Sequence, residues 1–272
     1  MPAASSVDPP FTDAEALARL LHEAEAKRQL ILPLTERLPA LTPREAYGIQ
    51  QALVERSQAE GARLVGYKLG FTSLAKQAAM GVYEPIYGTL LEGMQGVDGG
   101  SLPLDRFIHP RVEPEVAFVM GRDLSGPAVT EQDVRAATAS LHPALDVIDS
   151  RYEAFRFQLP DVIADNASGA AFVLGPAIAS FQDLDLAALE VAFYQNGRRV
   201  SQGTGKDVMG SPAQAVAWLA RALHAQGRIL PAGAVVLSGA LVAPLAVSAG
   251  DAFEARFGSL GNVSLTFAPQ EA

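Results

Sequence analysis

The chain has 272 residues and a formal net charge of −9, and its length is sufficient for one large domain or two small ones with a sizeable core. The acidic balance argues against binding to nucleic acid or to an anionic membrane surface, because both partners require a basic patch. Cysteine is absent, which excludes disulfides, thiolate nucleophiles and cysteine-ligated metal, so any metal must be held by oxygen or histidine. The first ten residues lack the basic and apolar pattern of a secretory signal, and we expect a cytoplasmic protein.

Two helices are expected at the beginning of the chain. The stretch Thr12-Asp-Ala-Glu15 has the spacing of a capping box and predicts a helix that runs to about Gln29. A second capping box, Thr42-Pro-Arg-Glu45, carries proline in the first turn and predicts another helix that ends before Gly61. We therefore expect a helical N-terminal portion over residues 1–62.

Short apolar runs broken by glycine begin after these helices and predict a β-rich portion over residues 63–272. Lys68 lies in the first of these runs, between two glycines that permit close approach of another backbone. Its ammonium group could point into a site and meet an anionic substrate, or Lys68 could be a solvated lysine on an edge strand. Ser73 is expected to cap a short helix that reaches Met80.

Two glutamates stand two positions apart in the apolar run that follows Arg111. Because side chains alternate along a strand, Glu113 and Glu115 should project to the same face, with their Cα atoms roughly 6.5 to 7 Å apart. Two carboxylates in a half-buried sheet repel each other, which favours a hard divalent cation between them; the alternative is an ordinary strand with one wet face. Pro114 cannot donate a ladder hydrogen bond and indicates an edge strand or a bulge.

A third carboxylate is expected from a later strand. Thr130 predicts the start of a helix that runs to about Leu141, and a strand should follow it. Asp146 lies between two apolar residues of that strand and is the better candidate for a third metal ligand. Asp149 should instead pair with Arg151, which shares its face.

Three further segments have distinct patterns. The small polar residues Asp165, Asn166 and Ser168 are expected to supply hydrogen bonds in a loop. Asn196-Gly197 separates two alternating runs and predicts a tight β-hairpin. Residues 229–250 carry no charge, but glycine and proline divide them into short pieces typical of buried strands rather than of a membrane span.

Five stretches from about residue 48 onward carry a family resemblance when taken together: Gly66-Tyr-Lys-Leu-Gly-Phe-Thr-Ser73, Pro85-Ile-Tyr-Gly88, Ile108-His-Pro-Arg-Val-Glu-Pro-Glu-Val-Ala117, Val147-Ile-Asp-Ser-Arg-Tyr-Glu-Ala-Phe-Arg-Phe157 and Ala164-Asp-Asn-Ala-Ser168. They resemble the small metal-dependent hydratases and decarboxylases of aromatic meta-cleavage pathways, in the fumarylacetoacetate-hydrolase-like superfamily. The resemblance implies an α+β fold with a helical N-terminal portion and a mixed β-roll or β-sandwich of the fumarylacetoacetase C-terminal-like type.

The resemblance also implies the site. A magnesium or manganese ion would be held by Glu113, Glu115 and a third carboxylate, Asp146, where this group usually has the longer glutamate. Lys68 would act as the catalytic and substrate-binding cation, and Ser168 would donate a hydrogen bond to the substrate. Ile86 occupies the position at which the hydratases resemble one another in carrying an aspartate thought to handle protons, and isoleucine cannot do so.

The implied reaction is decarboxylation of the 2-oxo dicarboxylic acid 2-oxo-3-hexenedioate (4-oxalocrotonate) to 2-hydroxypenta-2,4-dienoate. The alternatives are hydration of 2-hydroxypenta-2,4-dienoate by a 2-oxopent-4-enoate hydratase, a carbon–carbon hydrolase of acylpyruvate type, and a catalytically silent subunit of a hydratase. Magnesium and manganese both take oxygen ligands, and the residues do not separate them. The resemblance implies a homo-oligomer or a complex with a hydratase.

Overall fold

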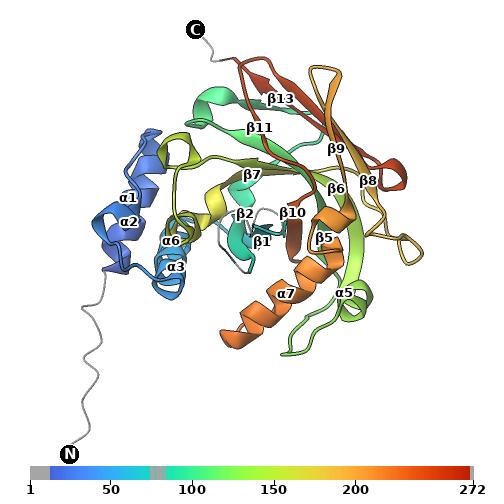
Figure 1. Ribbon diagram of the computed structural model, residues 1–272, viewed down its shortest axis with the longest axis horizontal. Coiled ribbons are helices and arrows are strands. Elements are labelled where there is room, and N and C mark those ends of the chain that lie inside the picture. Colours follow the sequence, from blue (N-terminus) through green and yellow to red (C-terminus); the bar gives the residue numbers. More distant parts are fainter. Residues whose placement is uncertain (1–12, 74–76, 78–81, 83, 270–272) are drawn as a thin grey trace, which may run out of the picture.

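Three helices precede the first strand in the computed structural model, which describes residues 13–73, 77, 82 and 84–269. The elements are α1 (Ala14–Lys27), α2 (Leu34–Arg37) and α3 (Pro43–Ala59), which lie together at one side of the molecule (Figure 1). The predicted capping box at the start of α3 is present, with Thr42 and Glu45 bonded to each other's backbone amides. Asp13 accepts a hydrogen bond from Ala16 at the start of α1, whereas the predicted cap Thr12 and the helix predicted over residues 73–80 fall largely outside the described residues.

The larger sheet has eight strands and a mixed topology. Its hydrogen-bonded order is β2-β1-β10-β5-β6-β7-β3, and β11 pairs with β5. The β1–β10 and β3–β7 pairs are parallel, and the other pairs are antiparallel. Its strands are β1 (Leu64–Gly70), β2 (Ile86–Leu91), β3 (Gln95–Gly96), β5 (Arg111–Met120), β6 (Thr138–Ile148), β7 (Gly169–Leu174), β10 (Val235–Ala240) and β11 (Leu245–Ala246).

A second sheet of five strands covers one side of the first. Its order is β4-β13-β12-β8-β9, and the β8–β9 hairpin turns at Asn196-Gly197 as predicted. The strands are β4 (Ser101–Pro103), β8 (Glu190–Gln195), β9 (Arg198–Thr204), β12 (Ala252–Arg256) and β13 (Asn262–Ala268). Helix α7 (Pro212–Ala225) packs on β10 and on α5 (Glu131–Ala137), below the sheets in Figure 1.

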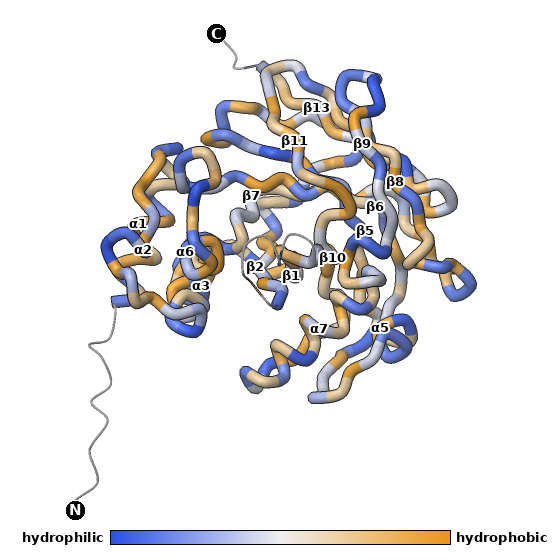
Figure 2. Tube along the Cα trace, in the orientation of Figure 1, coloured by the Kyte–Doolittle hydropathy of each residue, from blue (hydrophilic) through white to orange (hydrophobic). Residues whose placement is uncertain are grey.

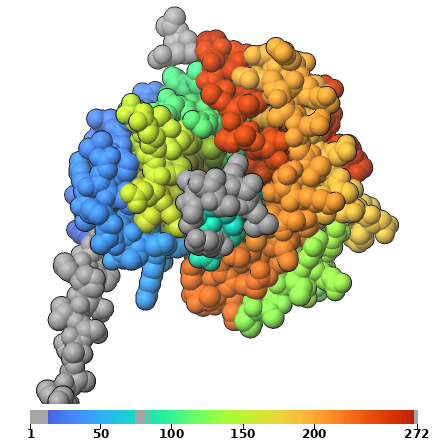
Figure 3. All heavy atoms as spheres, in the orientation of Figure 1, coloured from blue at the N-terminus to red at the C-terminus, as the bar shows by residue number. Residues whose placement is uncertain are grey.

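Short helical turns complete the fold. Helix α6 (Leu159–Ala164) packs on α3, and the two segments adjoin in Figure 3. The single turns are η1 (Glu92–Met94), η2 (Leu104–Arg106), η3 (Glu153–Phe155), η4 (Asn166–Ser168), η5 (Gly205–Asp207) and η6 (Gly258–Leu260). The α+β architecture with a curled mixed sheet confirms the predicted fold class.

The two faces of the larger sheet bury different side chains. One face carries Val112, Val116 and Phe118 into the main core, which also receives Phe253 of the second sheet and Leu219 of α7. A separate cluster on the N-terminal side joins α1–α3 to α6. Hydrophobic residues accordingly follow much of the central strands, and hydrophilic ones gather at outer turns (Figure 2). The division of the chain at residues 62 and 63 stays a prediction.

The predicted helix from Thr130 to about Leu141 is wrong in its length. Helix α5 ends at Ala137, and β6 begins at Thr138 because this segment pairs with β5 as far as Met120. Tertiary pairing thus overrides the local helical pattern. In the described part of the chain, no helix is long and apolar enough to cross a membrane, and the uncharged residues 229–250 contain β10 and β11.

Candidate metal and substrate site

Three carboxylates meet on one face of the larger sheet. Glu113 and Glu115 alternate along β5 to the same face, and Asp146 of β6 lies directly opposite Glu113 in the antiparallel ladder. One carboxylate oxygen from each residue lies within 4.8 Å of the others. The exposed fractions are 9 % for Glu113 and 0 % for both Glu115 and Asp146, so the alternative of a wet strand face is wrong.

A bulge in β10 holds Glu115 in place. The register between β10 and β5 shifts between Leu237 and Ala240, and the amide of Gly239 donates a 2.6 Å hydrogen bond to Oε2 of Glu115. Gly239 has φ +102°, and an added Cβ would overlap the side chain of Thr72, so this position requires glycine. The prediction that Pro114 marks an edge strand is wrong, because β5 is central in the sheet, and the bulge found here belongs to the neighbouring strand β10.

Lys68 reaches the same cluster from β1. Its Nζ lies 2.6 Å from Oδ2 of Asp146 and donates a 3.1 Å hydrogen bond to the carbonyl of Ala167. The residue is only 1 % exposed, and β1 lies between β2 and β10, so the alternative of a solvated lysine on an edge strand is wrong. Burial opposes the charge, but Asp146 and the two glutamates outweigh it and raise the pKa of Lys68.

The cluster holds more negative than positive charge. Burial raises the pKa of Glu115 well above its usual value, and the nearby charges of Asp146 and Glu113 raise it further. Burial also raises the pKa of Asp146, which the ammonium of Lys68 opposes; we assign this pair as ionised because the two charged atoms are in contact.

Two buried oxygens of the cluster lack a hydrogen-bond donor among the described residues. They are Oε1 of Glu115 and Oδ1 of Asp146, whereas Oδ2 of Asp146 is in contact with Nζ of Lys68. Unsatisfied buried carboxylate oxygens are costly, and a hard divalent cation with oxygen ligands satisfies them. The donor set therefore fits a metal ion.

A pocket of about 290 Å³ opens beside this cluster. Its polar lining includes Lys68, Glu113, Ser168 and Arg111, and the first three are residues that the sequence had singled out. The apolar lining comprises Leu69, Phe71, Ile86, Ile148, Phe155, Phe157, Val162, Ala167, Ala240 and Pro244. Small polar or charged molecules with a short carbon chain suit such a mixture.

Ser168 reaches the pocket through a left-handed turn. Residues Asn166, Ala167 and Ser168 have φ values of 50°, 52° and 54°, a conformation that L-residues rarely adopt. The turn is fixed to β2 by Asn166, which both accepts from and donates to the backbone of Thr89. Its conformation presents the Ala167 carbonyl to Lys68, so the strained turn directly shapes the site.

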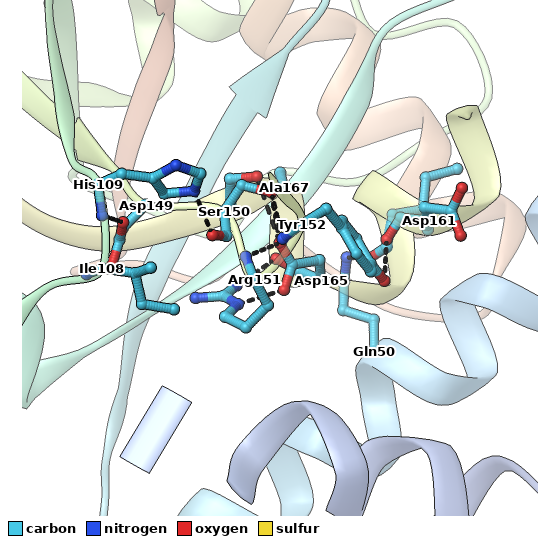
Figure 4. Close-up of polar contacts among 12 residues, drawn as sticks. Gln50, Ile108, His109, Asp149, Ser150, Arg151, Tyr152, Asp161, Asp165 and Ala167 are labelled. Carbon is cyan, nitrogen blue, oxygen red and sulfur yellow. Dashed lines mark hydrogen bonds and ion pairs between the residues drawn. The ribbon is translucent and has the colours of Figure 1, made fainter. Parts of the chain in front are cut away.

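A buried ion pair between Arg151 and Asp165 lies next to the turn of residues 166–168 and stabilises it (Figure 4). The guanidinium of Arg151 contacts the carboxylate of Asp165 and donates a 2.7 Å hydrogen bond to its carbonyl. The Ser168 hydroxyl donates to the same carboxylate at 3.4 Å. Burial raises the pKa of Asp165 to about 6, although Arg151 opposes this shift.

The predicted pairing of Asp149 with Arg151 is therefore wrong. Strand β6 ends at Ile148, so the alternation that placed the two side chains on one face does not continue. The Asp149 carboxylate instead accepts hydrogen bonds from the amides of Ile108 and His109, at 2.7 and 2.8 Å (Figure 4). It fixes the segment that leads into β5.

Sequence reasoning missed much of the pocket lining, including Arg111 and Phe155. Arg111 stands two positions before Glu113, so strand alternation alone could have placed it on the same face. Phe155 has φ +56° in an irregular segment, and no periodic pattern indicates where its ring lies. The sequence did not indicate the contribution of Gly239 either, because that contribution depends on a bulge.

Comparison with known proteins agrees with this arrangement. A sequence model of the fumarylacetoacetate (FAA) hydrolase C-terminal region matches residues 96–268, which is more than half of the chain. The chain belongs to the fumarylacetoacetate hydrolase family. Within the match lie all three carboxylates and Ser168, while Lys68 of β1 precedes it.

Two similar members of the fumarylacetoacetate hydrolase family cover nearly the whole chain. A 4-oxalocrotonate decarboxylase of Pseudomonas putida is 40% identical over 93% of this chain and 96% of that protein. 2-Keto-4-pentenoate hydratase 1 of Dechloromonas aromatica (strain RCB) is 42% identical over 93% of this chain and 97% of that protein. Overall identity therefore does not separate the two reactions.

A solved structure shares the whole fold. The 4-oxalocrotonate decarboxylase from Pseudomonas putida G7, complexed with magnesium and adipate, superposes with a TM-score of 0.92 at 38% identity. The similarity covers 96% of this chain and 100% of that one, so the N-terminal helices belong to the shared architecture.

Proposed function

We propose that this protein catalyses the metal-dependent decarboxylation of 2-oxo-3-hexenedioate to 2-hydroxypenta-2,4-dienoate. The observation that carries the proposal is the buried group of Glu113, Glu115 and Asp146, with unsatisfied oxygens, beside Lys68 at the wall of a pocket. The related decarboxylase that binds magnesium and adipate supports both the metal and a six-carbon dicarboxylate.

The three carboxylates would hold a magnesium or manganese ion. When bound, such an ion supplies positive charge that stabilises an enolate oxygen and orients a 2-oxo acid. Glu115 is held for this role by the amide of Gly239, which occupies one carboxylate oxygen and leaves the other available. Asp146 is shared with Lys68, so its ligand geometry depends on the lysine as well.

The reaction breaks the C5–C6 bond of the substrate. The C6 carboxylate leaves as carbon dioxide, and its bonding electrons are delocalised through the conjugated system to the C2 oxygen, which then takes up a proton to give the enol. Lys68 carries a positive charge that stabilises this dienolate, because the surrounding carboxylates keep it protonated. Ser168 lines the same pocket, and its hydroxyl would turn from its long, 3.4 Å contact with Asp165 to donate a hydrogen bond to the substrate.

Hydration is the second candidate, because a hydratase that is 42% identical is about as similar to this chain as the decarboxylase is. Addition of water to a diene acid requires a group that delivers and removes protons. Ile86 lines the pocket at 2 % exposure and has no such group. The decarboxylase remains our first proposal for this reason, and a catalytically silent partner of a hydratase is a candidate of a different class.

The proposed reaction also implies a cellular location, a substrate class and an assembly. We infer a cytoplasmic protein that acts on a small 2-oxo dicarboxylic acid, as a homo-oligomer or in complex with a hydratase. Size measurement of the purified protein, alone and mixed with a hydratase of this family, would distinguish the two assemblies.

The direct test supplies metal-loaded protein with each substrate in turn. We expect carbon dioxide from 2-oxo-3-hexenedioate, no release after chelation, and recovery with magnesium or manganese. Water addition to 2-hydroxypenta-2,4-dienoate in place of decarboxylation would support the hydratase. Failure to bind a divalent ion or to act on either substrate would support the silent subunit.

A further inference from the structure

Arg111 is the second cation of the pocket. Among the lining residues that the structure describes, only Lys68 and Arg111 carry a positive charge. Lys68 is already engaged by Asp146 and by the Ala167 carbonyl. Arg111 is half-buried and makes no ion pair with a described residue, so its guanidinium can accept an anion.

An aromatic ring sets the position of this guanidinium. The Cζ atom of Arg111 lies 4.1 Å from the centre of the Phe155 ring, and both side chains line the pocket. A guanidinium stacked on a ring loses less freedom on binding an anion than a solvated one, and its outward edge keeps the paired donors that match a carboxylate.

The strand fixes where Arg111 stands relative to the carboxylates. Arg111 and Glu113 alternate to the same face of β5, with Cα atoms roughly 6.5 to 7 Å apart. Glu115 lies beyond Glu113 along β5, away from Arg111, and Asp146 lies across from Glu113 on β6. Arg111 thus stands at one end of the row of acidic residues on β5, and the fully buried Glu115 stands at the other.

The balance of charge in the site indicates what Arg111 can bind. The three negative charges of Glu113, Glu115 and Asp146 are matched by a divalent cation together with Lys68. A substrate with two carboxylates then brings two negative charges to a neutral inner site. One carboxylate belongs to the 2-oxo acid end, and the other needs a separate cation, because an unpaired carboxylate resists transfer from water.

We propose that Arg111, stacked on Phe155, binds the substrate carboxylate that lies far from the 2-oxo acid end and thereby selects dicarboxylates over monocarboxylates. This inference rests on the proposed 2-oxo acid site. A paired contact to the far carboxylate also fixes the direction of the C5–C6 bond that breaks, so Arg111 orients the leaving group as well as recognising it.

The test uses two stable ligands that differ only at the far end. 2-Oxoadipate has six carbons and two carboxylates, and 2-oxohexanoate has six carbons and one. We would measure both dissociation constants by calorimetry with manganese-loaded wild-type protein, Arg111→Gln and Arg111→Lys. Arg106→Gln is the matched control, because Arg106 also lies over a phenylalanine ring, at 5.7 Å, and does not line the pocket.

We expect the wild type and Arg106→Gln to bind 2-oxoadipate about 10- to 100-fold more tightly than 2-oxohexanoate, the range of a charge-assisted hydrogen bond. Arg111→Gln should lose this preference through weaker 2-oxoadipate binding, with the 2-oxohexanoate constant unchanged within about twofold. Arg111→Lys should retain part of the preference, because it keeps the charge without the paired donors.

Three results would overturn the inference. They are a wild type without preference for 2-oxoadipate, an Arg111→Gln protein that keeps the preference, and an equal loss for both ligands, which would place Arg111 at the 2-oxo acid end or in a structural role. Ligand binding separates this inference from the proposed reaction. Protein that shows the Arg111-dependent preference without releasing carbon dioxide would contradict only the reaction.

Discussion

Glu115 is the carboxylate whose surroundings suit it best to bind a metal ion. One oxygen accepts the Gly239 amide and the other has no donor in the described structure, while burial and two neighbouring carboxylates raise its pKa. In the absence of metal, ionisation of this group is therefore unfavourable. The same features make it an effective ligand, because a divalent cation removes the repulsion that burial imposes.

Glu115→Gln should weaken manganese binding by at least about tenfold, because the variant loses an anionic ligand. The metal-free variant should nevertheless unfold at a temperature no lower than the wild type, because glutamine cannot ionise and so never places a repulsive charge in this buried site. Calorimetric titration and thermal unfolding would measure the two effects. Glu190→Gln, at an exposed glutamate of β8, is the control. Unchanged manganese affinity in Glu115→Gln would count against the site.

Strand alternation is the residue-scale rule that made the carboxylates predictable. It placed Glu113 and Glu115 on one face, and the structure does bring Asp146 and Lys68 to them. The same rule gave the wrong partner for Asp149, because β6 ends one residue earlier and Arg151 turns to Asp165. Alternation is reliable only as far as the strand extends.

The bulge in β10 and the turn of η4 are the two irregular elements that shape the site. Both depend on backbone conformations that a regular ladder would not allow: Gly239 has φ +102°, and three successive residues of η4 lie in the left-handed region. Neither follows from hydrophobic periodicity. Sequence patterns therefore predicted the strands that carry the ligands, but not the irregularities that orient them.

Gly239→Ala should reduce manganese affinity and stability together. An added Cβ would overlap Thr72, and moving the backbone would withdraw the amide from Glu115. Gly233→Ala is the control that distinguishes steric overlap with a neighbour from backbone strain. Gly233 also has positive φ, +80°, but an added Cβ there meets open space. We expect that control to lose only stability. Equal manganese affinity in the two variants would argue against the role of the bulge.

Arg151→Met should lower the free energy of unfolding by about 3–5 kcal/mol, because it leaves the buried carboxylate of Asp165 without its partner. Arg256→Met is the control; its pair with Glu254 lies at the surface, with side chains 49 % and 32 % exposed, and such pairs contribute about 0–1 kcal/mol. Urea unfolding would measure both. A loss in Arg151→Met no larger than in the control would show that the ion pair does not hold the turn.

Tertiary pairing explains the main error at the element scale. Thr130 does cap a helix, but residues from Thr138 onward join β6 because β5 offers a long partner strand. A local pattern contains no information about that partner. The N-terminal helices and the hairpin at Asn196-Gly197 depend on local caps and turns, and there the sequence was sufficient.

At the scale of the whole molecule, the site couples metal, pH and stability. A carboxylate whose pKa is higher in the folded state than in the unfolded chain contributes stability at low pH, and this contribution is lost as pH rises. Glu115 is such a group, with its pKa raised well above 4.5. A bound divalent metal reverses the sign of this pH dependence, because the metal binds the ionised carboxylates of the folded protein and so adds stability as pH rises.

We therefore expect the chelated protein to lose part of its unfolding free energy as pH rises above about 4.5, the ordinary glutamate value. Saturating manganese should increase stability, and the increase should grow with pH. In Glu115→Gln, the unfolding free energy should depend less on pH, both with chelator and with manganese. Denaturant unfolding across the pH range, with and without chelator, would measure this. A manganese effect that is the same at all pH values would contradict the coupling.

The most direct measurement of the central claim is product analysis with 2-oxo-3-hexenedioate by ultraviolet spectrum and mass. With magnesium or manganese, we predict one carbon dioxide for each 2-hydroxypenta-2,4-dienoate formed, and neither product with chelator or with Glu115→Gln. Carbon dioxide release that persists without metal, or metal-loaded wild-type protein that leaves the substrate unchanged, would contradict the account.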